Sequence, residues 1–400
     1  MASNDILASS AVVSDSIPRA RTAPVRWIDE SIGCKERRKT MISTLADPVV
    51  IGGGVTTVAM ALLRLVARPF GLLDRPGGHK RHNGAIPAIG GLAMFAGLVV
   101  ALLTTPGGAF DLRVFLASAA VLVTVGALDD AFRLSARLRL VAQVAAAYWM
   151  YLASTSGVHM TSIGDLFGLG IIDVSAISAF VTVFVIVAGV NAFNMLDGLD
   201  GLAGGVALVA LALLIGATPH GLCPAFTQIS LALIGCLLAF LGFNAPLGFN
   251  RRLRSFMGDA GSTLLGFALA TMMIGASQGV TAVATPMTMG WLVLVPTTDM
   301  TWSVVRRLSR GQSPFHADNE HLHHLMMRLG LSSRGACLAI LLIALVAGLF
   351  GLALERNGVP EWGSLLLFLA TGTGLVVFTR ALGASRAPRP PAPRTQPQAT

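Results

Sequence analysis

The sequence predicts an all-α polytopic membrane protein, and three observations support this fold class. Hydrophobic residues make up 54% of the 400 residues and charged residues only 12%, whereas about a quarter of the residues in a soluble domain are charged. Apolar runs of about 20 residues, the length that crosses roughly 30 Å of hydrocarbon, recur along the chain. The basic residues behind the net charge of +9 stand in short clusters between these runs, which is typical of membrane topology. We therefore expect a lipid bilayer around the chain and no nucleic-acid partner.

Eleven of these apolar runs are candidates for transmembrane helices. They cover residues 45–66, 88–104, 114–128, 138–155, 174–190, 202–218, 225–243, 260–279, 284–302, 335–354 and 362–379. Together they predict a transmembrane domain of about 11 helices over residues 41–380, with no separate soluble domain. The Pro-rich stretch that follows, residues 381–400, is expected to form a disordered cytoplasmic tail.

Basic residues are distributed unequally over alternate loops, and Lys and Arg favour the cytoplasmic side of a membrane. One set of loops contains most of them: Arg68, Arg75, Lys80, Arg81, Arg133, Arg137, Arg139, Arg251, Arg252, Arg254, Arg306, Arg307, Arg310, Arg328 and Arg334. The opposite set of loops contains only Arg113 and Arg356. We expect the first set to face the cytoplasm from a bacterial inner membrane, so the chain is a multi-pass protein with a cytoplasm-facing active-site cleft.

Residues 1–40 conflict with this topology. They carry a basic cluster at Lys35, Arg37, Arg38 and Lys39, yet an odd number of spans places them outside. We expect that translation begins at Met41, almost directly before the first span, and that residues 1–40 are an N-terminal tail outside the native chain. The intact mass of the native protein tests this expectation.

Five polar segments fall on the predicted cytoplasmic side. The first, LDRPGGHKRHNGAIPAIGG, contains the cluster His79, Lys80, Arg81 and His82. Its cations could hold phosphate. The alternative is a loop whose charges only set the topology.

The second segment, GALDDAFRLSARLRLVAQ, places the adjacent carboxylates Asp129 and Asp130 where a span meets the cytoplasm. Neighbouring like charges are unfavourable unless a cation relieves them. This indicates a divalent metal, or a general base beside one. The alternative is a surface salt bridge to Arg133 or Arg137.

The third segment, NAFNMLDGLDGLAGG, spaces Asn191, Asn194 and Asp197 three residues apart. That spacing predicts one face of a helix end, and Asp200 would continue the row. The interleaved glycines allow the backbone to approach a ligand closely. The alternative is a set of Asx turns and caps between two helices.

The fourth segment contains GDAGS, in which residues 258–262 open a span. A helix start with free N–H groups suits an anionic oxygen or an acid that binds a metal, although Asp and Ser are also common helix caps.

The fifth segment, SPFHADNEHLHH, contains four histidines, His316, His321, His323 and His324. We expect them to act on phosphate or in acid/base chemistry. Zinc is the alternative ligand, but the segment lacks the i, i+4 spacing of zincins and a Cys partner. The acids elsewhere fit Mg²⁺ better. A plain interfacial loop is the remaining alternative.

Five polar segments on one membrane face favour one shared site. Acids for Mg²⁺ and cations for phosphates, beside lipid, together indicate phosphoryl chemistry on a membrane lipid.

The motifs LDRPGGHKRH, GALDD, NAFNMLDGLDGL, FMGDAGS, PTTDMTWSVVRR and HADNEHLHH follow one another from Asp74 to His324. In this order the chain resembles the polyprenyl-phosphate N-acetylhexosamine-1-phosphate transferase family. Within that family it is most similar to the group that starts O-antigen and related cell-surface glycans with GlcNAc-1-phosphate.

The resemblance implies transfer of an N-acetylhexosamine-1-phosphate from a UDP-N-acetylhexosamine to undecaprenyl phosphate, with release of UMP. It also implies Mg²⁺ as the cofactor, with Mn²⁺ as the alternative, and leaves a homodimer open. Asp259 would be the leading metal ligand, with Asp197. The expected catalytic residues are Asp129, Asp130, Asp197 and Asp200, of which the first pair would act on the lipid phosphate.

The resemblance further implies a set of substrate-binding residues. Phe256 could stack on uracil, and the histidine segment would bind diphosphate or sugar. The full expected set is Lys80, Arg81, His82, Asn191, Asn194, Phe256, His316, His321, His323 and His324.

Two positions depart from the family pattern. His79 stands where an Arg is usual, and Asn319 stands where the HADRxHxHH form has Arg. The loss of two cations should weaken phosphate contacts, which bears on those loops and on the choice of sugar.

Two alternative functions remain from the sequence. The first is the phospho-N-acetylmuramoyl-pentapeptide transferase of peptidoglycan synthesis, whose last loop carries a different His-rich signature. The second is an ion-coupled transporter, which predicts charges near the bilayer midplane in repeated, broken helices. The charges here lie at one edge instead.

Overall fold

A computed structural model of the chain describes residues 30–74, 86–104, 112–154, 158–216, 224–244, 253–279, 282–313 and 320–386. The chain divides into two units, Met1–Ser43 and Thr44–Thr400. The first unit is described only from residue 30, where a helix begins. The remainder of this section concerns the second unit.

Helices form nearly all of the regular structure in the described residues, so the predicted all-α class is confirmed. The helices are α1 Glu30–Val66, α2 Gly90–Thr104, α3 Leu112–Phe132, α4 Ala136–Ala153, α5 Ser178–Leu196, α6 Leu202–Gly216, α7 Pro224–Asn244, α8 Gly258–Ser277, α9 Pro286–Leu292, α10 Leu294–Ser309, α11 Leu322–Arg328, α12 Ser333–Arg356 and α13 Glu361–Arg386. A short 3₁₀ turn, Ser175–Ile177, precedes α5, and two-residue strands, β1 Leu73–Asp74 and β2 Ile86–Pro87, pair antiparallel.

Seven helices in the described part of the chain are long and apolar enough to cross a membrane. They lie at Asp47–Val66, Leu112–Phe132, Ser175–Leu196, Ala225–Asn244, Gly258–Ser277, Ser333–Arg356 and Glu361–Ala381. The chain is therefore a polytopic membrane protein, whereas the predicted number of eleven spans is not confirmed.

Four predicted spans differ from this set for physical reasons. Helices α2 and α6 are apolar but shorter. Helix α4 carries Arg137 and Arg139 in its first turns, which lowers its hydropathy. The predicted span 284–302 is broken at Val293, whose N–H bonds back to the Gly290 and Trp291 carbonyls and ends α9 before α10 begins.

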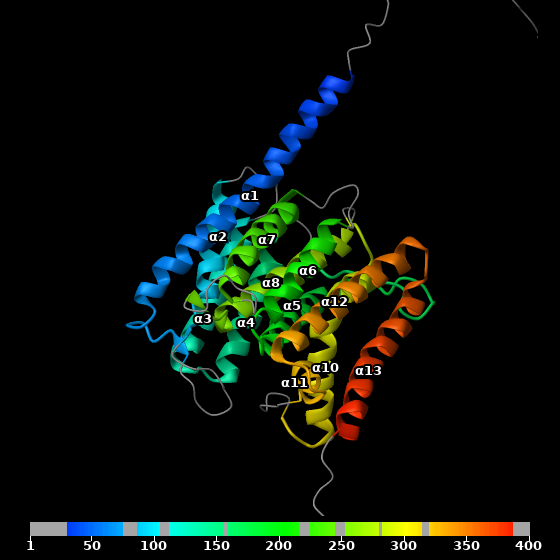
Figure 1. Cartoon of the computed structure of the whole chain (residues 1–400). Coiled ribbons are helices and arrows are strands. Elements are labelled where there is room, and N and C mark those ends of the chain that lie inside the picture. The colour runs from blue at the N-terminus through cyan, green and yellow to red at the C-terminus, as the bar shows by residue number, and fades with distance from the viewer. Residues whose placement is uncertain are drawn as a thin grey trace, which may run out of the picture. The chain divides into compact units, whose positions relative to one another are not determined.

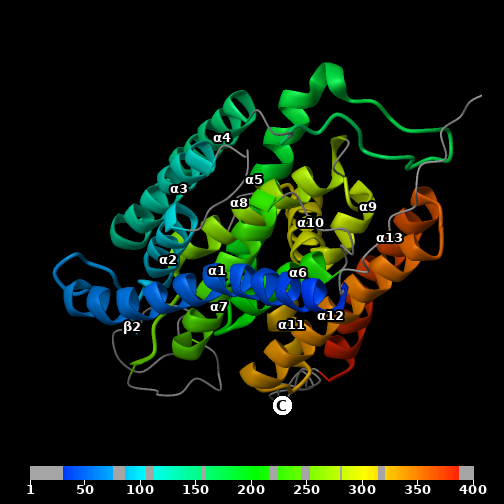
Figure 2. The same ribbon diagram turned by 90° about the horizontal axis from the view of Figure 1, so that it is seen from above.

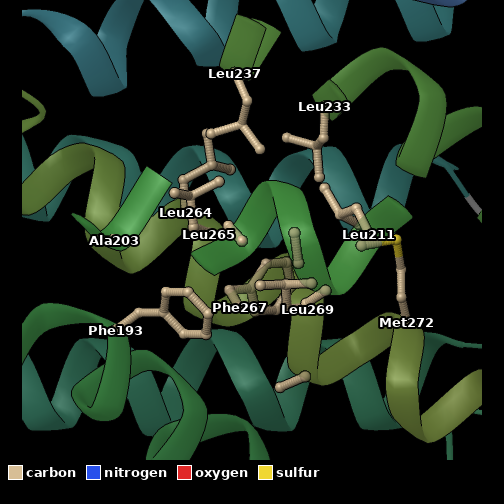
Figure 3. Close-up of a cluster of buried hydrophobic side chains, with 14 of the residues drawn as sticks. Phe193, Ala203, Leu211, Leu233, Leu237, Leu264, Leu265, Phe267, Leu269 and Met272 are labelled. Carbon is tan, nitrogen blue, oxygen red and sulfur yellow. The ribbon is translucent and has the colours of Figure 1, made fainter. Parts of the chain in front are cut away.

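Helix α8 is the centre of the fold. It contacts α2, α3, α5, α6, α7 and α9, and every residue from Ala260 to Ser277 is buried. Figure 3 shows side chains of α8 among those of α5, α6 and α7: Leu264, Leu265, Phe267, Leu269 and Met272 beside Phe193, Ala203, Leu211, Leu233 and Leu237. A helix buried along its length is a rigid support for the residues at its start.

Glycines let three neighbouring helices approach α8. A Cβ at position 126 of α3 would lie 2.6 Å from the Ala260 backbone, and a Cβ at position 266 would lie 2.5 Å from the Gly189 carbonyl oxygen of α5. On α2, a Cβ at Gly91 would lie 2.1 Å from the Gly261 nitrogen. Small residues at such crossings are typical of helix packing in membranes.

Two groups of helices flank this centre. Figure 2 shows α2, α3 and α4 on one side of α5 and α8, with α12 and α13 on the other, and Figure 1 agrees. Helix α11 contacts α12 and α13, and α10 contacts α5, α12 and α13. Helix α13 continues to Arg386, beyond the predicted boundary at residue 381. The structure describes nothing after residue 386, where most of the predicted tail lies.

Candidate active site

The turn between α3 and α4 brings an arginine back to the acids at the end of α3. Arg133 directly follows α3 in the left-handed region, with φ 55°, and its N–H donates to the Asp129 carbonyl at 2.8 Å. Ser135 caps α4 by accepting from the Leu138 N–H at 3.3 Å. The second turn of α4 therefore presents Arg139 to Asp129.

Arg139 lies between two carboxylates. Its Nη1 is 2.7 Å from Asp129 Oδ2 and 3.5 Å from Asp259 Oδ2. Asp129 is buried, so a cation is needed to offset the cost of its charge. The predicted alternative, a salt bridge to Arg133 or Arg137, named the wrong residue for Asp129, since its partner is Arg139, two residues after Arg137.

Asp130 caps helix α8 from another helix. Its carboxylate accepts the Asp259 N–H at 3.0 Å and the Ala260 N–H at 3.4 Å. Gly258 precedes them with φ 72°, and a Cβ there would lie 2.4 Å from Asp130 Oδ2, so only glycine fits. The prediction of free N–H groups at this helix start is wrong for these two, because Asp130 already occupies them.

Asn194 of α5 fixes the second oxygen of Asp259. Its Nδ2 donates to Asp259 Oδ1 at 2.7 Å and to Ser262 Oγ at 3.1 Å. Asn191, one turn earlier, donates instead to Gln143 Oε1 of α4 at 2.7 Å and to the Val187 carbonyl at 2.8 Å. The two asparagines therefore link α5 to α8 and to α4.

The predicted row of polar residues does not continue beyond Asn194. Helix α5 ends at Leu196, and its C-cap Asp197 has φ −74° and ψ 54°, which is not helical. A turn that includes Gly201, with φ 77°, follows. The prediction that Asp197 and Asp200 share the helix face of Asn191 is wrong, because the helix stops before them.

A pocket lies between α3, α4, α5 and α8. Its polar end is formed by Arg139, Gln143, Asn194, Asp259 and Thr263, and its other lining residues are Leu122, Val125 and Gly126. The pocket thus combines an apolar wall with carboxylate, amide and guanidinium groups.

The turn after α5 is held to the segment before α8. Asp200 forms an ion pair with Arg254, whose Cζ lies 5.2 Å from the Phe256 ring centroid. The Gly201 N–H donates to Asn244 Oδ1 at 2.7 Å, and Asn244 Nδ2 donates to the Ser255 carbonyl at 2.9 Å. Asp200 and Phe256 therefore belong to one structural unit through Arg254.

The histidine segment forms a second cluster. His321 Nδ1 is 2.9 Å from Asp299 Oδ2 of α10. The ring centroid of His323 lies 5.9 Å from that of His321 and 4.1 Å from that of His324. Within the described residues, which do not include His316, no group of three or more His, Cys, Asp or Glu is arranged to hold a metal ion.

His323 connects this cluster with the turn after α5. A Cβ at Gly198 would lie 2.4 Å from the His323 ring, so the ring packs against the backbone directly after Asp197. Burial, followed by the neighbouring charge of His324, lowers the pKa of His323 to about 4. His323 is therefore neutral at pH 7.

Glu320, which precedes His321, is surrounded by arginines. Arg306 Nε lies 3.6 Å from Glu320 Oε2, Arg310 Nη2 lies 3.5 Å from Oε1, and Arg380 of α13 also forms an ion pair with Oε2. Arg380 lies over the Trp302 ring at 5.4 Å. The start of the histidine segment is thus held by α10 and α13.

Comparison with known proteins identifies the family. Residues 112–277 match the family described as Glycosyl transferase family 4. The chain is 39% identical over 321 residues to the undecaprenyl-phosphate alpha-N-acetylglucosaminyl 1-phosphate transferase of Salmonella typhi, covering 78% of this chain and 85% of that protein. The proteins with that description from Escherichia coli K12 and Haemophilus influenzae are 38% and 35% identical, over 85% and 89% of their lengths. The chain belongs to the polyprenyl-phosphate N-acetylhexosamine-1-phosphate transferase family.

For this member of the transferase family, the structure brings eleven of the expected site residues into two adjoining regions. Four of them gather around the start of α8: Asp129, Asp130, Asn194 and Asp259. Asn191 bonds the pocket residue Gln143, and Asp197 is exposed at the end of α5. The other five lie in the segments described above: Asp200, Phe256, His321, His323 and His324. Lys80, Arg81, His82 and His316 lie outside the described residues, as do His79 and Asn319.

The sequence reasoning missed four polar residues that hold the site of this transferase: Gln143, Asp299, Glu320 and, as a site residue, Arg139. Signals were present. Arg139 follows a Ser cap by four residues, which places it near the start of a new helix, close to the end of the helix that carries Asp129. Asp299 is an acid inside an apolar run, which by itself indicates a functional or structural demand.

Proposed function

We propose that the chain transfers GlcNAc-1-phosphate from UDP-GlcNAc to undecaprenyl phosphate and releases UMP. The observation that carries the proposal is the pair of carboxylates Asp129 and Asp259, which share one cation beside an apolar wall. A chain with this site and 39% identity to an enzyme of that name supports the activity. The reaction would be the first membrane step of O-antigen or a related cell-surface glycan.

The acid cluster has a donor set that fits Mg²⁺. Mg²⁺ is usually bound by one or two carboxylates together with substrate phosphates and water. Asp129 and Asp259 already hold one cationic group, the Arg139 guanidinium, between them. We assign Asp259 and Asp129 as the residues that would hold Mg²⁺ or Mn²⁺; the ion would neutralise charge on the transferred phosphoryl group. Asp197, the other ligand implied by the resemblance, lies exposed at the end of α5, outside this pair.

The two adjacent acids of α3 receive different roles. Asp130 uses its carboxylate on the N–H groups of Asp259 and Ala260 and so positions Asp259. Asp129 is the acid whose side chain reaches Arg139 and the pocket. We assign Asp129 to act on the lipid phosphate through the ion that it would hold and through Arg139, which it positions. Asp130, which was expected to act on substrate, instead positions Asp259.

The lining of the pocket supports a placement of the two substrates. Leu122 and Val125 would contact the prenyl chain, and Arg139 would bind the phosphate of undecaprenyl phosphate. Overall, an oxygen of that phosphate forms a new bond to the phosphorus that carries GlcNAc, and the bond from this phosphorus to UMP breaks. The UDP-sugar would extend from Asp259 toward Asp200, Phe256 and the histidine segment.

We propose that the chain crosses the membrane eleven times. Helices α2, α4 and α6 and the α9–α10 pair would add four crossings to the seven long helices. This arrangement places the ends of α3 and α10 at the cytoplasmic face of a bacterial inner membrane, with residues 41–380 as the membrane domain. Labelling of single cysteines at Arg133 and Arg356 by an impermeant maleimide would test it, because the two should react from opposite sides.

A membrane assay tests the activity. Membranes containing the chain would receive undecaprenyl phosphate with UDP-GlcNAc, UDP-GalNAc or UDP-N-acetylmuramoyl-pentapeptide, with Mg²⁺ or with a chelator. We expect UMP and a lipid product with UDP-GlcNAc and Mg²⁺, and neither with the chelator. UMP release from the pentapeptide substrate alone would instead assign the chain to peptidoglycan synthesis.

A further inference from the structure

Asp299 is a buried acid of α10 that holds the start of the histidine segment with both oxygens. Oδ2 lies 2.9 Å from His321 Nδ1, and Oδ1 accepts the Leu322 N–H at 2.7 Å. The side chains of Asp299 and His321 are 6% and 10% exposed. A carboxylate in this position fixes the place of the His321 ring and the backbone that carries it.

The contact also determines which ring nitrogen carries the proton. An ionised carboxylate can only accept hydrogen bonds, so a neutral His321 must have its hydrogen on Nδ1. The Ser303 hydroxyl, 3.4 Å from the same nitrogen, is the other polar group beside it. Within the described residues no hydrogen bond is made by His321 Nε2, which is left as an acceptor on the opposite edge of the ring.

The surroundings of His321 keep this arrangement in place. The ring lies parallel to that of His323, with an interplanar angle of 2°. Next to His321 along the chain, the Arg306 side chain donates to the Glu320 carbonyl oxygen and to the Ser303 hydroxyl, each at 3.4 Å. The His321 ring is therefore held by its own backbone, by the contact at Nδ1 and by the His323 ring against one face.

We propose that Asp299 is a positioning residue for the transferase reaction, which holds His321 as the Nδ1–H tautomer with Nε2 directed as an acceptor to the UDP-sugar. The proposal rests on the proposed function for the identity of the substrate. An acceptor nitrogen suits a hydroxyl or an amide N–H of that substrate. Asp299 itself would touch no substrate atom.

The variant Asp299→Asn separates this role from simple capping. The asparagine oxygen can still accept the Leu322 N–H, but its NH₂ group then faces His321 Nδ1 and places the ring hydrogen on Nε2. An aspartate-to-asparagine change of this kind behind a serine protease histidine keeps the geometry and lowers kcat by about 10⁴. Here we expect kcat to fall at least about 100-fold, with KM for the UDP-sugar changed by less than about threefold.

A double-mutant cycle tests whether Asp299 acts through His321. His321→Gln, Asp299→Asn and the double variant would be assayed together, with the exposed outer residue Asp173→Asn as the control. We expect the double variant to be no slower than His321→Gln within about threefold, because coupled residues are not additive. Losses that multiply, or an Asp299→Asn enzyme near the wild-type rate, would overturn the proposal.

Nitrogen-15 NMR of labelled histidines in the full-length chain gives a readout that needs no substrate. The His321 signal, assigned by its loss in His321→Gln, should show Nδ1–H in the wild type and Nε2–H in Asp299→Asn. Nε2–H in the wild type would contradict the proposal. This result needs only the wild-type chain, so it decides the question even if the Asp299→Asn chain fails to fold. If the wild type shows Nδ1–H but releases no UMP from UDP-GlcNAc, the proposed substrate is wrong and the tautomer assignment stands.

Discussion

The start of α8 and the histidine segment use the same device but differ in what supports it. In each, an aspartate from another helix accepts a backbone N–H at a site residue or next to it: Asp130 accepts from Asp259, and Asp299 accepts from Leu322, which follows His321. Helix α8 is buried along its length and clamped by glycine contacts, whereas α11 is a seven-residue helix that follows an acid, Glu320, paired with arginines. The support of the acid cluster should therefore be sensitive to crowding where the helices cross, and the support of the histidine segment to loss of a charged partner.

The largest effect should follow removal of charge from the acid cluster. Asp259→Asn and Asp129→Asn each take one carboxylate from the pair that shares Arg139. We expect UMP release to fall by at least about 100- to 1,000-fold, because groups that stabilise transition-state charge contribute on that scale. Membrane insertion and expression should be unchanged. Wild-type turnover in either variant would remove that residue from the site.

A second test addresses the support of α8 by close helix packing. Gly126→Ala would place a Cβ 2.6 Å from the Ala260 backbone, so α3 and α8 must move apart. Overpacking of this kind costs about 1–3 kcal/mol, and we expect a lower Tm in detergent together with a loss of activity. Gly374→Ala in α13 is the matched control, since no atom lies within 4 Å of its Cβ position. Equal Tm values would show that the packing at Gly126 is not limiting.

A smaller effect is expected at the clamp on Glu320. Arg380→Ala removes the contact from α13, but the pair is partly exposed, and such pairs contribute about 0.2–1 kcal/mol. We expect KM for the UDP-sugar to rise up to about fivefold with little change in kcat. Arg356→Ala, which replaces an exposed arginine at the C-terminal end of α12, should leave both constants unchanged. A fall in kcat without a change in KM would contradict the idea that this clamp acts on substrate binding.

The last expected effect is on the pH dependence of stability rather than on turnover. The pKa of His323 is lowered from 6.5 to about 4 in the folded chain, with His324, Asp299 and His321 as its titratable neighbours. The unfolded chain binds this proton more readily, so the contribution to stability is present above pH 6.5 and is lost as the pH falls toward 4. Thermal unfolding at pH 7.5 and pH 5 should show a smaller loss of Tm for His323→Gln than for the wild type. The same loss in both would mean that other groups control this range.

Sequence patterns predicted what is local and missed what depends on pairing between helices. The apolar runs located the helices, and Asp129, Asn194 and Asp259 could be selected because their motifs place polar groups at helix ends. The GALDD motif could not predict that Asp130 caps α8, because the N–H groups that donate to Asp130 are more than a hundred residues away along the chain. The end of α5 at Leu196 was also missed, because the three-residue spacing of polar side chains was continued through a turn that contains Gly198 and Gly201.

The close approach of Gly198 to the His323 ring limits which residues related chains can carry at this position. A single hydrogen at position 198 is what lets the loop behind the acids touch the imidazole, so any larger residue there would force the two surfaces apart. A distant homologue with a larger residue at the position of Gly198 would need a different conformation of the histidine segment. This single substitution would identify homologues in which the histidines are placed differently.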